Sequence, residues 1–225
     1  MPDTAASTES ASSAAVRPWT RGAVAWVGVV MVLAVVVYWP ALQVRYFADD
    51  YIQIAKLEGL LGPHHPAGLY SFFADNPAEI LAHRARGSLP WWTVDDFRFV
   101  HVRPLASLLL ELDHAIAPRA AWLHHLHSMG WLLAMLGTLA LVLRRSTTPA
   151  IAAGALLIFA LDETLAWTVA WVANRCAMIT ATFVFGALAV HMKRRDNPSP
   201  RWWWAELVCW LVALSAGEYA VRGLA

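Results

Sequence analysis

The sequence is poor in charge and in cysteine, and both shortages limit what it can be. Only 15% of its 225 residues are charged, 59% are hydrophobic, and the mean hydropathy is +0.48. A water-soluble domain carries roughly 25% charged residues, so the apolar excess indicates a protein that resides in a lipid bilayer. The two cysteines, Cys176 and Cys209, lie in apolar stretches, which argues against a disulfide-rich scaffold.

Net charge and N-terminal signals are also weak. A net charge of +1 creates no field that would attract nucleic acid or an acidic partner, so neither is expected. Residues 1–21 are mostly small and polar, and we predict that they form a disordered cytoplasmic tail. No small-residue cleavage site follows the first apolar run, which is longer than a signal-peptide core, so an uncleaved first helix is predicted.

Apolar runs predict about five transmembrane helices. The first contains 23 residues without a charge, and a bilayer core needs about 20 residues of helix. The predicted spans are 22–44, 122–143, 149–168, 174–192 and 202–215, with a long loop from 45 to 118. The expected fold is an all-α integral membrane protein whose polytopic membrane domain covers residues 22–225.

The distribution of Lys and Arg predicts the orientation. With the N-terminus in the cytoplasm, basic residues collect in the cytoplasmic segments: Arg17, Arg21, Arg144, Arg145, Lys193, Arg194, Arg195 and Arg201. The short outer turn between the third and fourth spans contains only Arg175. Short cytoplasmic loops are typically enriched in such residues. The loop 45–118 is therefore predicted to lie on the outer face.

Three short helices are predicted in this loop. One follows Asp50 and is expected to stop at Gly62. A second begins at Asn76-Pro77 and runs to about residue 85, as a polar cap followed by proline indicates. A third, 13 residues long, begins at Pro104 and is too short to span. We expect it to lie on the outer leaflet through one apolar face, formed by Leu105, Leu108, Leu109, Leu112 and Ile116.

Two acidic pairs lie in the loop. Asp49 and Asp50 directly follow the first span, where adjacent carboxylates can act as a general base or hold a divalent metal. The alternative is structural: Asp50 caps the following helix and Asp49 favours its dipole. For Asp95-Asp96 a solvated turn is the favoured interpretation.

Two arginines are candidates for phosphate binding. Arg103 precedes the third loop helix, where a guanidinium can grip a phosphate with two hydrogen bonds; a lipid headgroup contact without a catalytic role is the alternative. Arg175 is predicted to pair with Asp162 or Glu163 beside an outer cavity, since charges at that depth need a partner.

Three histidines cluster at the start of the second span. The H-H-x-H spacing of His124, His125 and His127 resembles a metal cluster but does not put all three rings on one helical face. Neutral histidines at the interface are therefore the favoured interpretation. The sequence makes no cofactor certain, and a divalent metal stays the alternative.

Several short motifs occur in a recognisable order. They are F-A-D-D-Y (47–51), V-R-P-L-A-S-L-L-L-E-L-D (102–113), W-L-H-H-L-H-S (122–128), A-W-V-A-N-R-C-A-M-I-T-A (170–181) and A-G-E-Y-A (216–220). Together they resemble the polytopic GT-C glycosyltransferases, in particular the protein O-mannosyltransferase-like branch and its bacterial relatives.

This resemblance implies a glycosyltransferase that moves a sugar from a polyprenyl-phosphate donor to an acceptor on the outer face of the bacterial inner membrane. It implies that Asp49 or Asp50 is the catalytic base or metal carboxylate. It also implies that Arg103 and Arg175 hold the donor phosphate, with His125 and Glu218 as further substrate-binding residues.

The number of spans departs from this family. Members usually have about ten or more, so five predict a truncated member, and the alternative is a catalytically incomplete or non-enzymatic polytopic subunit. A transporter is less favoured, because no span is broken by Gly or Pro and no inverted repeat is visible.

Overall fold

The computed structural model describes residues 20–61, 64–65, 67–72, 77–87 and 89–223. Nearly all of the regular secondary structure in this part of the chain is helical, as predicted. The exception is one pair of two-residue strands. The predicted tail, apart from residues 20 and 21, lies outside the described residues.

Six helices correspond to the predicted spans. They are α1 (Arg21–Tyr38), α5 (Ala121–Ser146), α6 (Pro149–Ala160), α7 (Thr164–Ala170), α8 (Arg175–Asp196) and α9 (Pro200–Ala216). A 3-10 helix, η1 (Trp39–Gln43), continues α1, and another, η2 (Val172–Asn174), precedes α8. The third predicted span is divided between α6 and α7.

Three of these segments are long and apolar enough to cross a membrane: Arg21–Gln43, Ala121–Ser146 and Val172–Asp196. A fourth is obtained if α6 and α7, which are bent by 57° at their junction, count as one broken span. The helix α9 has 17 residues, about 26 Å at 1.5 Å per residue, and falls short of a full bilayer core. The predicted total of five spans therefore stays a prediction.

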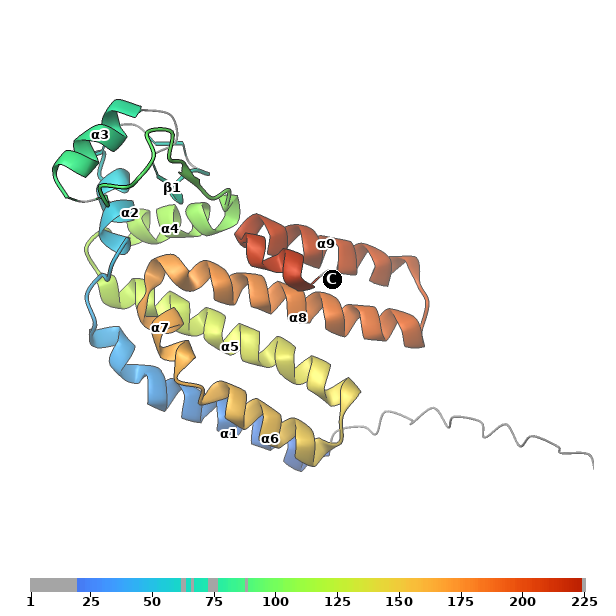
Figure 1. The fold of residues 1–225 in the computed structure, drawn as a ribbon. Coiled ribbons are helices and arrows are strands. Elements are labelled where there is room, and N and C mark those ends of the chain that lie inside the picture. The colour runs from blue at the N-terminus through green and yellow to red at the C-terminus, as the bar shows by residue number, and fades with distance from the viewer. Residues whose placement is uncertain (1–19, 62–63, 66, 73–76, 88, 224–225) are drawn as a thin grey trace, which may run out of the picture.

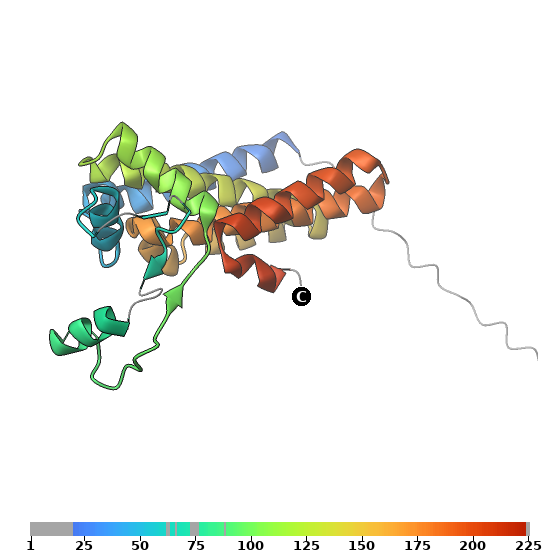
Figure 2. The ribbon, with the colours of Figure 1, turned by 90° about the horizontal axis from the view of Figure 1, so that it is seen from above.

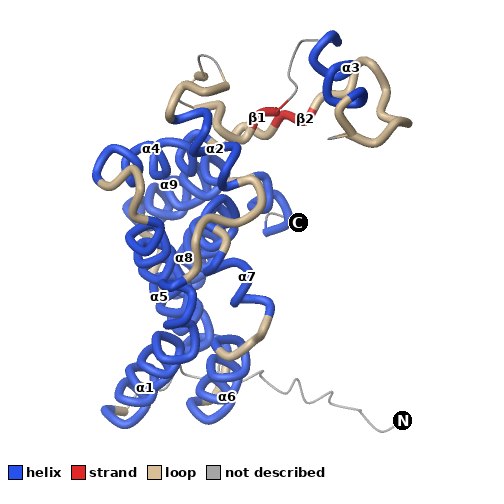
Figure 3. Tube along the Cα trace, turned by 90° about the vertical axis from the view of Figure 1, so that its left-hand side faces the viewer, coloured by secondary structure: helices blue, strands red, loops and turns tan. Residues whose placement is uncertain are grey.

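The long helices form one bundle with α5 at its centre (Figures 1 and 3). On one side α5 packs along α8, which in turn packs along α9; on the other side lie α1 and α6. Apolar side chains such as Val30, Leu132 and Leu156 are fully buried between them. Outward-facing residues of α1 such as Val32 and Val36 remain exposed, as expected for a surface that faces lipid.

The bundle has two different ends. At the basic end α1 begins, α5 and α8 finish, and the basic residues Arg144, Arg145 and Lys193 to Arg195 gather (Figure 1). The opposite end, called here the loop end, is where α1 finishes, where α5 and α8 begin, and where the described residues between 44 and 120 lie. The structure thus separates the basic turns from the long loop.

The loop contains α2 (Asp50–Leu57), α3 (Pro77–Ala85) and α4 (Pro104–Ile116), with strands β1 (Ser71–Phe72) and β2 (Phe99–Val100) paired antiparallel. Figure 2 shows α4 lying on the bundle, whereas α3 extends away from it. The starts of α3 and α4 at proline are as predicted, although the cap Asn76 lies outside the described residues. The predicted stop of α2 at Gly62 is wrong: α2 ends at Leu57, because Gly59 adopts a left-handed φ of 73°.

The predicted apolar face of α4 is largely exposed. Leu108, Leu112 and Ile116 are half or more exposed, and the opposite face buries Ala106, Leu110 and Asp113 against the bundle. The expected position on a leaflet would use this exposed leucine stripe, and it stays a prediction.

After α9 the chain turns sharply at Gly217 into η3 (Glu218–Gly223). A Cβ on Gly217 would lie 2.9 Å from Thr180 Oγ1 and 3.1 Å from Tyr219 Cδ2, so only glycine allows this close approach to α8. The turn brings Glu218 and Tyr219 to the loop end.

Candidate functional site

A cavity of about 200 Å³ lies at the loop end, between the loop and the start of α8. Its polar lining residues come from separate parts of the chain: Asp49, Tyr70, His101, Arg103, Asn174, Glu218 and Tyr219. The aromatic residues Phe72, Phe99 and Trp171 complete its wall. Three of the six predicted site residues, Asp49, Arg103 and Glu218, therefore meet in one cavity.

Asp49 and Asp50 have different surroundings although they are adjacent. Asp49 is partly exposed at the cavity, and its Oδ1 accepts a hydrogen bond of 2.6 Å from Trp171 Nε1. Ala48, immediately before the pair, has a φ of 48°, a left-handed conformation that costs an L-residue roughly 1–2 kcal/mol. After this strained turn, both carboxylates accept hydrogen bonds from residues 171–173, between α7 and α8.

Asp50 is buried, with 1% of its surface exposed. Its carboxylate accepts backbone N–H groups from Phe47 at 2.9 Å, Ala173 at 2.6 Å and Val172 at 3.3 Å. It does not cap α2 with its side chain, because α2 has no side-chain cap bond and Asp49 is the residue at the cap position. Asp50 therefore fastens the segment after η1 to η2, the short helix before α8.

Burial raises the pKa of Asp50 to about 6, although the backbone N–H groups of Phe47, Ala173 and Val172 act in the opposite direction. A carboxyl group whose pKa is raised on folding stabilises the protein below its ordinary pKa, and this contribution is lost as the pH rises through 6.

We therefore expect the melting temperature of the detergent-solubilised protein to rise between pH 7 and pH 5, and Asp50→Asn to remove that part of the rise. Differential scanning fluorimetry measures it. Asp50→Asn also loses acceptors for backbone N–H groups, so its melting temperature is lower throughout and the slopes are the quantity compared. Asp96→Asn, at an exposed position, is the control with unchanged slope. Equal slopes for wild type and Asp50→Asn would contradict the expectation.

Arg103 and Glu218 form an ion pair across the cavity. Arg103 Nε donates to Glu218 Oε2 at 2.9 Å, and Nη2 donates to the other carboxylate oxygen and, at 3.3 Å, to Tyr219 OH. The guanidinium, 8% exposed, also lies between the rings of Tyr70 and Tyr219. On the other side of Glu218, His101 Nδ1 lies 3.2 Å from Oε1.

Both partners have shifted pKa values. The hydrogen bond from Arg103 is the main reason that the pKa of Glu218 is lowered to about 2. Burial acts to lower the pKa of Arg103, but Glu218, Cys176 and Tyr219 outweigh it and raise that pKa above its ordinary value. The pair is therefore charged at every physiological pH, and its carboxylate, 46% exposed, is the more accessible half.

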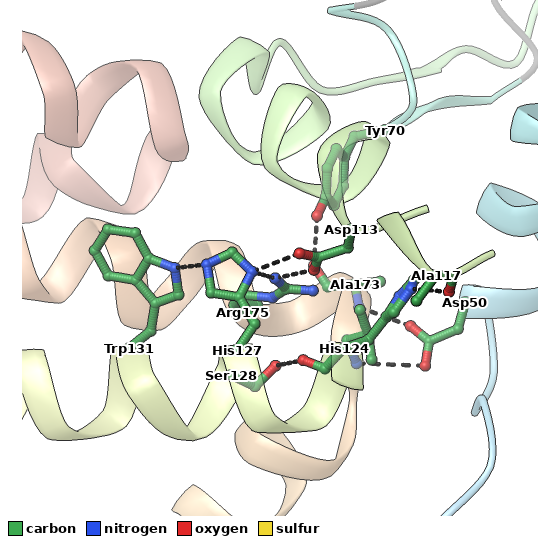
Figure 4. A network of polar contacts seen from close by, with 11 residues as sticks. Asp50, Tyr70, Asp113, Ala117, His124, His127, Ser128, Trp131, Ala173 and Arg175 are labelled. Carbon is green, nitrogen blue, oxygen red and sulfur yellow. Dashed lines mark hydrogen bonds and ion pairs between the residues drawn. The ribbon is translucent and has the colours of Figure 1, made fainter. Parts of the chain in front are cut away.

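A second polar network lies deeper, between α4, α5 and α8 (Figure 4). One oxygen of Asp113 is paired with Arg175, and the other lies 2.7 Å from His127 Nδ1. Trp131 donates its indole N–H to His127 Nε2 at 3.0 Å. Burial would raise the pKa of Asp113, but the hydrogen bond with His127 and the charge of Arg175 together lower it.

This network corrects the predicted partner of Arg175. The expectation of Asp162 or Glu163 is wrong, because Arg175 pairs with Asp113, and Asp162 instead accepts hydrogen bonds from Thr164 at the start of α7. Arg175 is 3% exposed and does not line the cavity. The helix α4 crosses the start of α8, and this crossing makes Asp113 the nearest carboxylate.

His125 is fully buried and likewise does not line the cavity. Within the described part of the chain, no group of three or more His, Cys, Asp or Glu side chains is arranged to hold a metal ion. Asp95 and Asp96 are exposed, and Asp95 pairs with Arg84 away from the cavity, in agreement with a solvated turn.

Several cavity residues were not predicted. Trp171 belongs to the motif at residues 170–181, in which only Arg175 was a site candidate. No sequence pattern marks Tyr70 or His101 as a site residue. Tyr70 donates its hydroxyl to Ala173 O at 2.9 Å, a contact between residues 103 positions apart. Such a pairing has no local pattern by which the sequence would indicate it.

Comparisons were made with protein-family models, with curated proteins and with solved structures. None of the three finds a match for this chain. The functional proposal therefore rests on the geometry of the site together with the motifs of the sequence.

Proposed function

We propose that this chain is an integral membrane protein that transfers a sugar from a polyprenyl-phosphate donor to a hydroxyl acceptor at the loop end, on the outer face. The observation that carries the proposal is the meeting of Asp49, Arg103 and Glu218 in one aromatic-walled cavity next to apolar helices. Aromatic rings suit sugar faces, and a carboxylate beside a guanidinium suits acid–base chemistry at a phosphate.

In the proposed reaction Asp49 acts as the general base. Its carboxylate takes the proton of the acceptor hydroxyl while that oxygen forms a bond to the anomeric carbon. The bond between the anomeric carbon and the phosphate oxygen breaks, and polyprenyl phosphate leaves with the electron pair. Asp50 has a supporting role, because its oxygens already accept three backbone N–H groups.

Arg103 is the proposed ligand of the donor phosphate. Its guanidinium pairs with Glu218, so the incoming phosphate has to displace the more accessible carboxylate. Arg175, predicted for the same role, is occupied by Asp113 below the cavity and is assigned a positioning role instead.

Two observations favour a second candidate, a polytopic subunit without activity of its own. Arg103 is neutralised by Glu218, and a cavity of about 200 Å³ is smaller than the roughly 300–1,000 Å³ of most ligand sites. In this candidate the ion pair only fastens η3 to the loop.

Incubation of membranes with radiolabelled polyprenyl-phosphate mannose distinguishes the two. We expect membranes that contain the chain to consume the donor and move the label into an acceptor fraction, above the level of membranes from the same host without it. Donor consumption equal to that background would favour the inactive subunit.

A further inference from the structure

Two arginines lie just beyond the ends of candidate spans at the loop end. Arg45 is two residues after Gln43, the last residue of the first candidate span. Arg119 is two residues before Ala121, where the next candidate span begins. If these helices cross a bilayer, both guanidinium groups are at headgroup depth, where long basic side chains meet lipid phosphates.

The two arginines line the same pocket, of about 370 Å³, which is separate from the cavity described above. The other lining residues are Tyr46, Tyr51, Glu58, Pro118 and Ala121. The end of the first span, the helix α2 and the turn between α4 and α5 therefore form one concave surface.

Neither arginine has a side-chain hydrogen bond or ion pair within the part of the chain that the structure describes. Other arginines differ, because each of these is paired with a carboxylate: Arg84, Arg103, Arg145, Arg175 and Arg194. Arg45 and Arg119 are both exposed, so their donors are available to a ligand.

The surroundings of this pocket are apolar. Val44, directly before Arg45, is 41% exposed, and Ile116 and Trp122 on the other side are 66% and 55% exposed. A ligand that uses this surface needs an apolar portion next to its charged group, which a free anion lacks.

We propose that this pocket binds the headgroup of a zwitterionic phospholipid, with its phosphate between Arg45 and Arg119 and its ammonium group at Glu58. Guanidinium groups recognise phosphate through paired hydrogen bonds, and the exposed Glu58 carboxylate disfavours a second negative charge but attracts an amine. The proposal rests on membrane insertion, which forms part of the proposed function, and is independent of sugar transfer.

The test uses the full chain purified in mild detergent and probed with short-chain phosphatidylethanolamine and phosphatidylglycerol by native mass spectrometry. We expect phosphatidylethanolamine to bind with the higher affinity, and Arg45→Gln with Arg119→Gln to weaken it at least tenfold. Arg86→Gln with Arg98→Gln removes the same charge from exposed loop positions and is the matched control. Glu58→Gln should abolish the preference for phosphatidylethanolamine over phosphatidylglycerol.

Three results would overturn the proposal. One is equal binding by wild type and the Arg45/Arg119 variant, and another is an equal loss in the Arg86/Arg98 control. The third is binding of soluble glycerophosphoethanolamine as strong as that of the lipid, which would assign the pocket to a free phosphate compound. Alkaline carbonate extraction tests membrane insertion by itself. Release of the chain from membranes would contradict insertion. Retention of the chain, with lipid binding unaffected by the arginine substitutions, would contradict only the lipid site.

Discussion

Replacing Asp113 by asparagine is expected to lower the free energy of unfolding by about 3–5 kcal/mol, the usual cost of breaking a buried ion pair from one side. The substitution keeps the volume of the side chain but leaves Arg175, 3% exposed, as an uncompensated charge among α4, α5 and α8. It also removes the carboxylate from His127, which the network shares. Loss of the helical circular dichroism signal as the mole fraction of dodecyl sulfate rises measures the effect.

Asp196→Asn is the matched control for this experiment. Asp196 pairs with Arg145 at the basic end, but its side chain is 61% exposed. An exposed pair contributes roughly 0–1 kcal/mol, so the control should unfold close to wild type. In addition, Asp113→Leu combined with Arg175→Met should be less destabilised than Asp113→Asn, because no unpaired charge is left. A loss for Asp113→Asn no larger than that for Asp196→Asn would contradict this account of the network.

Asp49→Asn is expected to lower the rate of sugar transfer by roughly 10²–10⁴-fold, the range that general base catalysis supplies. Asparagine can still accept the hydrogen bond from Trp171 Nε1 through its amide oxygen, so the local structure is retained. What it cannot do is take up the acceptor proton. Initial rates with radiolabelled polyprenyl-phosphate mannose, at equal amounts of folded protein, measure the difference.

Asp96→Asn serves as the control for Asp49→Asn, since it removes an exposed carboxylate from the same loop. Its transfer rate should equal that of wild type. A wild-type rate for Asp49→Asn would show that Asp49 is not the base. Loss of folded Asp49→Asn protein, seen as a lower unfolding midpoint, would instead assign Asp49 to the structural role of fastening Trp171.

The positions of the helices could be predicted from local features of the sequence. Apolar runs give the approximate extents of α1 with η1, of α5 and of α8, and proline at the first position marks the starts of α3 and α4. The helix α9 begins at Pro200, two residues before the predicted start of the fifth span. The end of α2 is missed because Gly59 is also a plausible stop, and the left-handed conformation that it adopts is not marked by any local pattern. Local signals therefore specify elements well and their exact ends less well.

The composition of the site could be predicted only in part. Asp49, Arg103 and Glu218 stand out because charged residues are rare in this chain, but their meeting depends on how α4 and η3 pack at the loop end. The same packing gives Arg175 a partner 62 positions away in place of the carboxylates that are near it in sequence. The difference between Asp49 and Asp50 comes from their partners more than 120 positions away, Trp171 for Asp49 and the Val172 and Ala173 N–H groups for Asp50, which no residue pattern marks.

The bend between α6 and α7 has a consequence for the surrounding lipid. From the basic end α6 rises only about 18 Å at 1.5 Å per residue before the chain turns at Asp162, whereas a hydrocarbon core is about 30 Å thick. Asp162 and Glu163 are exposed there. The Tyr38 hydroxyl donates a hydrogen bond of 2.8 Å to the backbone carbonyl of Asp162. If these helices cross a bilayer, a thinner leaflet beside α6 and α7 would keep the two carboxylates hydrated. The protein would then carry a local depression of the membrane surface on this side, next to the end of α1 at Tyr38.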